Sequence, residues 1–169
     1  MSDLQAIADI VEIEALCGEF ADAGMMRDYD RFASLFTEDG AWRMPHAGLE
    51  FIGREAIRAG IEWAQENVFE YFVYQSHRGT IRLDGDAAAG RDYVMEFGRL
   101  RDGSSQLNCS LYHDRYRRTP RGWRFAERVY EVRYVDATPL AGAPGGGTRA
   151  HDRDRDRTDL PDHSGRSSS

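Results

Sequence analysis

The chain has 169 residues, which corresponds to one domain, and 41% of them are hydrophobic, enough for a globular core. Its formal net charge of −7 argues against nucleic-acid binding, which needs basic patches that neutralise phosphates. No apolar run reaches the roughly 18–20 residues of a membrane span, and no signal-peptide pattern opens the chain. We therefore expect a soluble, cytoplasmic protein that binds neither nucleic acid nor membrane.

The basic residues and the cysteines exclude several kinds of chemistry. All 22 basic residues are arginine, so catalysis through a lysine Schiff base and a Walker-type phosphate loop are both excluded. The arginine-, glycine- and alanine-rich usage also suggests a GC-rich bacterial gene. Cys17 and Cys109 fall among apolar residues and are expected to be buried. Because no Cys/His spacing resembles a zinc site, we expect neither a metal nor a cofactor.

The periodicity of apolar residues predicts helices first and strands later. Helical stripes cover residues 4–26, 28–36 and 53–67. Glu38-Asp39-Gly40 is expected to be a turn, and 41–44 and 51–52 to be short strands. Four long alternating segments follow, separated by Gly/Asp/Pro turns that are typical of antiparallel hairpins, at about 71–83, 87–100, 106–118 and 123–135. This order indicates an α+β fold with the helices on one face of a curved sheet.

The last part of the chain has a different composition. From about Ala137 onward there is almost no large apolar residue, and aspartate alternates with arginine. Such a segment buries too little apolar surface to offset the entropy of ordering it. We expect a folded domain over residues 1–136 and a disordered tail over 137–169.

His77 is the residue on which a functional interpretation depends most. Period-2 alternation in the strand 71–83 puts it on the same side as Val73, Ile81 and Leu83, so we expect it to face the interior. An inward histidine is either a hydrogen-bonded core residue or a proton-transfer group in a pocket.

Several segments, taken together and in order, resemble one known family. They are MMRDYDRFASLFTEDGAW (25–42), GREAI at the start of the third helix, SHRGTIRL (76–83), YHDRYRR (112–118) and GWRFAERVY (122–130). Over roughly residues 4–136 the chain resembles the SnoaL-like branch of the nuclear transport factor 2-like superfamily, which includes polyketide cyclases, scytalone dehydratase and hexachlorocyclohexane dehydrochlorinase. The resemblance implies a cone-shaped α+β barrel, with three N-terminal helices against a curved, mostly antiparallel sheet.

The resemblance also implies catalytic positions. In the dehydratase and dehydrochlorinase members a His–Asp pair performs acid/base chemistry, and His77 matches the histidine. Met25 occupies the position of the aspartate, which is the main departure from the family pattern. Asp22, one turn earlier on the helix, is a candidate replacement or else a solvated carboxylate. Arg128 matches an arginine of the dehydrochlorinase, or it forms a structural ion pair with a helix carboxylate.

Strand alternation and the resemblance add pocket residues. Tyr112 is a candidate catalytic hydroxyl donor, or it only packs in the core. Trp42 is either a core residue or part of the substrate wall. The residues expected to contact a substrate are mostly apolar, and they are Met25, Trp42, Tyr93, Met95, Phe97, Asn108 and Tyr130.

Two functions are consistent with these residues. The first is a cofactor-free lyase, isomerase or cyclase acting on an apolar, ring-containing small molecule in natural-product biosynthesis or catabolism. In it His77 moves a proton while Arg128 or Tyr112 stabilises an oxyanion. The second, which Met25 favours, is a non-catalytic ligand-binding or assembly module like the small subunit of aromatic-ring dioxygenases. In both cases we expect a homo-oligomer, dimer or trimer, because an open curved sheet leaves a face or an edge to cover.

Overall fold

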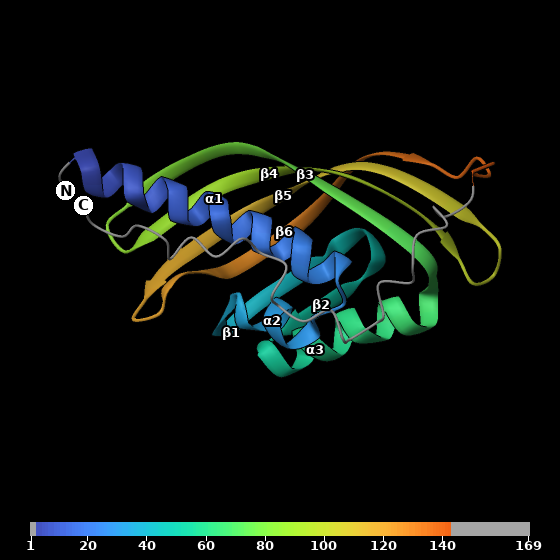
Figure 1. Ribbon diagram of the computed structural model, residues 1–169, viewed down its shortest axis with the longest axis horizontal. Coiled ribbons are helices and arrows are strands. Elements are labelled where there is room, and N and C mark those ends of the chain that lie inside the picture. The colour runs from blue at the N-terminus through green and yellow to red at the C-terminus, as the bar shows by residue number, and fades with distance from the viewer. Residues whose placement is uncertain (1–2, 143–169) are drawn as a thin grey trace, which may run out of the picture.

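The computed structural model describes residues 3–142 (Figure 1). Its helices are α1 (Asp3–Met25), α2 (Tyr29–Ser34) and α3 (Arg54–Trp63), and a π-helical turn, η2 (Ala64–Val68), continues α3. Two strands lie between α2 and α3, namely β1 (Phe36–Met44) and β2 (Leu49–Ile52), joined by the 3-10 turn η1 (Pro45–Ala47). The long strands are β3 (Phe69–Asp84), β4 (Ala87–Leu100), β5 (Ser105–Thr119) and β6 (Gly122–Asp136).

These elements confirm the predicted order of helices and strands, with one difference in the first strand. β1 begins at Phe36, so Glu38-Asp39-Gly40, which we expected to be a turn, belongs to the strand. The pairing of β1 with β6 shifts between Phe36 and Ala41, which accommodates this irregular stretch.

The six strands form one curved sheet in the order β2-β1-β6-β5-β4-β3. All neighbouring strands are antiparallel except β1 and β6, which run parallel. The last strand therefore returns to lie beside the first, which brings the short β1–β2 hairpin next to the four long strands. Figure 1 shows the sheet arching over α1, with α2 and α3 below it. The α+β cone predicted from the sequence is confirmed.

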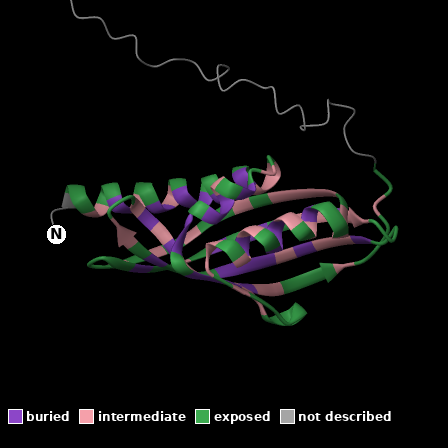
Figure 2. Ribbon diagram, turned by 90° about the horizontal axis from the view of Figure 1, so that it is seen from below, coloured by how far each residue is buried: buried purple, intermediate pink, exposed green. Residues whose placement is uncertain are grey.

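Aromatic residues fill the space between α1 and the sheet, and Phe20 lies at their centre. Its ring centroid is 4.4 Å from that of Phe32 and 5.8 Å from those of Tyr112 and Phe125. Figure 2 shows buried residues gathered where the helices meet the sheet, while the outward side of α1 is exposed. Aromatic rings at such separations attract one another in addition to burying apolar area.

A buried carboxylate attaches the first half of α1 to the β5–β6 hairpin. Asp9 accepts hydrogen bonds from Arg118 Nη2 at 2.6 Å and from Trp123 Nε1 at 3.2 Å. The hydrogen bond from Arg118 is the largest influence lowering the pKa of Asp9, which falls to about 2. Because this pKa lies below that of an unfolded chain, ionised Asp9 stabilises the fold above about pH 4. That contribution is lost as the pH falls toward 2.

We expect Asp9→Asn to lower the melting temperature at pH 7, since the neutral amide cannot pair with Arg118 as a carboxylate does. The difference from the wild type should shrink as the pH falls from about 4 toward 2, where Asp9 itself becomes protonated. Thermal unfolding followed by circular dichroism at several pH values measures this. Asp84→Asn is the matched control, because Asp84 is an exposed carboxylate at the end of β3. A pH-independent difference would contradict the expectation.

The face of the sheet that points away from the helices carries large apolar side chains. Tyr93, Met95 and Tyr134 are 46%, 40% and 55% exposed. Cross-strand pairing puts them on one face, because Tyr93 lies opposite Leu111 and Cys109 lies opposite both Met95 and Tyr134. No element within residues 3–142 covers this outer face. The homo-oligomer expected from the sequence stays a prediction, and this face is where we place its contact.

We expect light scattering to give a mass of two or three times 19.2 kDa at micromolar concentration. Met95→Arg should shift that mass toward the monomer, because a charge placed in an apolar interface is costly to desolvate. Glu55→Arg, an exposed charge change on α3 at the helix side of the sheet, is the control that should leave the mass unchanged. A monomeric wild type would refute the prediction.

The chain stays in contact with the folded body beyond the end of β6. The amide of Leu140 donates a hydrogen bond to Ser105 Oγ at 3.2 Å, and the carbonyl of Leu140 accepts one from Arg99 at 3.1 Å. Residues 137–142 thus contact the start of β5 and the end of β4. The remainder of the predicted disordered tail, 143–169, lies outside the described residues.

Candidate functional site

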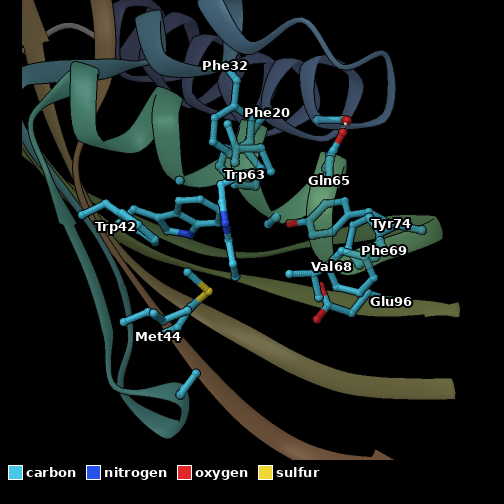
Figure 3. A pocket seen from close by; sticks show the side chains of 18 of the residues that line it. Phe20, Phe32, Trp42, Met44, Trp63, Gln65, Val68, Phe69, Tyr74 and Glu96 are labelled. Carbon is cyan, nitrogen blue, oxygen red and sulfur yellow. Dashed lines mark hydrogen bonds between the residues drawn. The ribbon is translucent and has the colours of Figure 1, made fainter. Parts of the chain in front are cut away.

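A cavity of about 700 Å³ lies between the helices and the inner face of the sheet (Figure 3). Its volume falls in the range of small-molecule sites, about 300–1,000 Å³. Most of its lining is aromatic or aliphatic and includes Phe20, Trp42, Met44, Trp63, Phe69 and Phe72. Such a lining favours an apolar ligand with a ring.

The sequence of α3 explains why there is space at this position. Ala56, Ala59, Gly60, Trp63 and Ala64 all line the cavity, and their spacing puts them on one face of a helix. Four of these five side chains are small, so the helix covers the cavity without filling it. The π-helical turn that follows brings Gln65 and Val68 into the wall. Turns of this type occur often at functional sites.

Glu96 is the only acidic residue among the described residues that line the cavity. It lies on β4, directly opposite Tyr74 on β3 and Asn108 on β5. Its Oε1 accepts a hydrogen bond from the hydroxyl of Tyr130 at 2.5 Å and from Asn108 Nδ2 at 3.0 Å. Removal from water raises the pKa of Glu96, and these hydrogen bonds oppose that shift only in part. The carboxyl is therefore suited to both accepting and donating a proton.

Two tyrosine hydroxyls accompany this carboxyl in the cavity wall. The hydroxyl of Tyr74 is buried and has no hydrogen-bond partner within the described part of the chain. The hydroxyl of Tyr112 accepts a hydrogen bond from Trp42 Nε1 at 3.1 Å, which leaves its proton available. Burial raises the pKa of both phenols, so they stay neutral donors. Figure 3 shows Tyr74 and Glu96 pointing into the cavity.

His46 lies at the mouth of the cavity, on the turn η1 between β1 and β2. It is exposed, and its ring lies 5.3 Å from the ring of Tyr130. A positive charge on His46 favours the ionised form of Glu96, although less than the hydrogen bonds do. Arginine is absent from the described residues that line the cavity. The site thus combines one carboxyl with neutral donors and apolar walls.

Arg128 is completely buried, but it lies beneath the cavity and does not line it. Its Nε donates to Asp114 at 2.8 Å and its Nη2 to Asp92 at 2.9 Å. The guanidinium carbon also lies 4.0 Å from the ring centroid of Tyr112 and 4.2 Å from that of Phe20. Arg128 thus forms ion pairs in the core, as in the structural alternative, but its partners are carboxylates on strands and not on a helix.

We expect Arg128→Met to destabilise the fold by about 3–5 kcal/mol, because it leaves Asp92 and Asp114 buried without a cation. Urea denaturation at pH 7 measures the free energy of unfolding. Arg115→Met, an exposed arginine on the neighbouring strand, should change it by less than about 0.5 kcal/mol. An Arg128→Met variant as stable as the wild type would show that the ion pairs of Arg128 with Asp92 and Asp114 are not needed for stability.

His77 does not face the cavity, and the predicted inward orientation is wrong. It lies opposite Tyr93 on the outer face of the sheet and is exposed. The pairing of β3 with β4 shifts between Arg78 and Ile81, which indicates a bulge. Because an extra residue reverses the alternation of side chains, Ile81 faces inward although His77, four residues earlier, does not.

Three residues of β4 that were expected to line the pocket also face outward. Tyr93, Met95 and Phe97 lie on the outer face, so the prediction that they line a pocket is wrong. Their inward neighbours are Val94 and Glu96. The sequence analysis did not predict Glu96 or Tyr74. Both alternate with the residues that were predicted to face inward, so reversing the assumed faces of β3 and β4 would have pointed to them.

Two residues of α1 also lie away from the cavity wall, namely Asp22, the candidate replacement for the aspartate, and Met25, which occupies the aspartate position. Asp22 is exposed and pairs with Arg31 of α2. Met25 lies in a small adjoining hollow, where its sulfur accepts a hydrogen bond from the amide of Tyr74 at 3.2 Å. The described residues that line the cavity therefore include neither His77 nor a carboxylate from α1.

The remaining predicted residues are at the cavity. Trp42, Asn108 and Tyr112 are part of its wall, and Tyr130 reaches it through the hydrogen bond to Glu96. Contact of these residues with a substrate stays a prediction. In residues 3–142 we find no group of three or more His, Cys, Asp or Glu side chains placed to hold a metal ion. None of the described helices is both long and apolar enough to cross a membrane.

The sequence of this chain is similar to a known domain family and to a known enzyme. A model of the SnoaL-like domain matches residues 2–129. The chain is 30% identical over 147 residues to a gamma-hexachlorocyclohexane dehydrochlorinase of Sphingobium indicum, covering 84% of this chain and 90% of that protein.

Solved structures show the same fold. The crystal structure of a type 2 hexachlorocyclohexane dehydrochlorinase (LinA) matches with a TM-score of 0.77 at 23% identity, covering 86% of this chain and 99% of that one. A structure described as a putative scytalone dehydratase from Novosphingobium aromaticivorans matches with a TM-score of 0.70 at 18% identity, covering 85% and 97%.

Proposed function

The chain belongs to the SnoaL-like family of the nuclear transport factor 2-like superfamily, and we propose that it is a cofactor-free enzyme of the lyase, isomerase or cyclase type. Its substrate is an uncharged, apolar small molecule with a ring. Relatives named as a dehydrochlorinase and a putative scytalone dehydratase support this type of chemistry in the family. The observation that carries the proposal is Glu96, a carboxyl with a raised pKa inside an apolar cavity.

Each group in the cavity has a role in the proposed reaction. The carboxylate of Glu96 takes a proton from a carbon next to a carbonyl of the substrate. Tyr74 and Tyr112 donate hydrogen bonds to the oxyanion that forms, because their hydroxyl protons have no acceptor within the described residues. The protonated Glu96 then returns the proton to another atom of the substrate, which completes an isomerisation. In an elimination, the electron pair of the enolate instead forms a carbon–carbon double bond, the bond to a leaving group on the next carbon breaks, and Glu96 gives its proton to that group as it departs with the bonding electrons.

Apolar surroundings make this carboxyl a better base than one in water. Acid/base catalysis is most efficient when the pKa of the catalytic group lies near the working pH. Desolvation moves the pKa of Glu96 in that direction, as it does for catalytic carboxyls in other apolar pockets. The hydrogen bonds from Tyr130 and Asn108 orient it. This assignment replaces His77, which lies on the opposite face of the sheet.

We expect the wild type to accelerate the exchange of solvent deuterium into the carbons beside the carbonyl of 2-tetralone, an uncharged ring ketone, followed by proton NMR. Glu96→Gln preserves shape and hydrogen-bonding capacity but removes the base, so the rate should fall by at least about 10²-fold. His77→Gln is the matched control and should leave the rate unchanged. Loss of exchange in His77→Gln with full activity in Glu96→Gln would refute the assignment.

A non-catalytic binding module of the same fold is the second candidate. The specific observation in its favour is that the cavity lacks the His–Asp pair, since Met25 takes the aspartate position and His77 faces outward. Such a module would bind 2-tetralone without accelerating exchange in either the wild type or Glu96→Gln. Saturable binding together with background exchange would therefore support the module and refute the enzyme.

A further inference from the structure

Glu96 is a partly buried carboxyl with few neighbours that can carry a charge. The groups facing it are Tyr74 on β3, Asn108 and Tyr112 on β5, Tyr130 on β6, Gln65 of the π-helical turn and His46 of η1. Only His46 is able to carry a positive charge, and it is exposed at the mouth. In contrast, the buried carboxylates beneath the cavity share Arg128. The charge of Glu96 therefore depends on water inside the cavity.

We propose that an uncharged ring ligand enters this cavity together with a proton that is taken up by Glu96, and that anionic ligands of the same shape are rejected. This inference rests on the cavity of the proposed function and specifies the charge of its ligand. It does not depend on whether a reaction follows binding.

The physical reason is the loss of solvent on binding. An apolar ligand displaces the water that solvates the carboxylate, and it brings no cation in exchange. The two hydrogen bonds from Tyr130 and Asn108 remain, but they leave one carboxylate oxygen without these donors. Desolvation disfavours the charged form, so the pKa of Glu96 is higher in the complex than in the free protein. The base of the proposed reaction is then the fraction of complexes in which Glu96 stays ionised, a fraction that grows as the pH rises.

The sign of the pH dependence follows from this shift. Since the pKa of Glu96 is higher in the complex than in the free protein, affinity is greatest at low pH, where both are protonated. It decreases as the pH rises between the two pKa values and levels off above them. An anion would in addition meet the carboxylate across an apolar space in which charge repulsion is poorly screened.

Two isosteric probes test the proposal, namely naphthalene-2-carboxamide, which is uncharged, and naphthalene-2-carboxylate. Calorimetric titration from about pH 5 to pH 8, in buffers with different ionisation enthalpies, gives both the affinity and the number of protons taken up. We expect the amide to bind with proton uptake and the carboxylate to bind at least tenfold more weakly. Glu96→Gln should bind the amide without uptake and without pH dependence.

A matched variant and a direct measurement locate the proton. His46→Gln should retain proton uptake, because the proposal assigns the proton to Glu96 and not to the histidine at the mouth. Carbon-13 NMR of the glutamate side-chain carboxyls of the wild type, with the Glu96 signal assigned by its loss in Glu96→Gln, should show a higher pKa when the amide is bound. This measurement on the wild type does not depend on the variant folding normally.

Several results would overturn the inference. They are equal binding of the two probes, absence of binding by the amide, amide binding without proton uptake, and uptake that disappears in His46→Gln but persists in Glu96→Gln. The outcome is separable from that of the proposed function. Proton-linked binding without deuterium exchange refutes the enzyme alone, whereas exchange with proton-neutral binding refutes this inference alone.

Discussion

The interaction on which the rest of this structure depends is the buried triad of Arg128, Asp92 and Asp114. These residues come from three adjacent strands, and their side chains meet beneath the cavity. Aromatic rings enclose the guanidinium, among them Phe20 of α1, so the triad joins the long helix to the sheet as well as strand to strand. A buried arginine paired in this way tolerates removal of neither partner without leaving an uncompensated charge.

The triad also supports the cavity above it. Tyr112 packs one face of its ring on the guanidinium of Arg128, while its hydroxyl accepts a hydrogen bond from Trp42 in the cavity wall. A residue in such a position has little freedom to move. The ion pairs in the core thus hold Tyr112 in place, and Tyr112 is a hydrogen-bond donor that a site in this cavity would need in a fixed position.

The carboxyls on the inner face of the sheet, buried or partly buried, fall into two kinds that differ in their partners. Asp92 and Asp114 share a cation, and burial raises the pKa of both even so. Glu96 has hydrogen bonds from neutral groups only, and His46 is the one side chain among the described residues lining the cavity that can carry a positive charge. A carboxyl paired with arginine is fixed in its role, whereas one without a cation is free to change its protonation state. This difference is the reason why we propose Glu96 as the reactive group and describe Arg128 by its contacts in the core.

The amino-acid sequence by itself was sufficient for the elements, the α+β class and the family. Turn residues and alternation locate the strands, because these signals are local. Alternation also put Asn108 and Tyr112 on one face of β5, and both line the cavity, because β5 pairs with β4 without an extra residue between them. His77 was misplaced because parity was carried across the irregular pairing between Arg78 and Ile81. Gly79 was the available warning, since glycine within a strand often marks a bulge.

Only the tertiary structure showed that Glu96 is the carboxyl that lines the cavity. Glu96 reads in the sequence as one polar residue of an alternating strand, and its exposure depends on whether other elements cover that face. Here α1 and α3, distant along the chain, cover the face and remove the carboxyl from water, while the small residues of α3 leave a cavity beside it. Desolvation is a property of the assembled neighbours, so no local pattern in the sequence carries it.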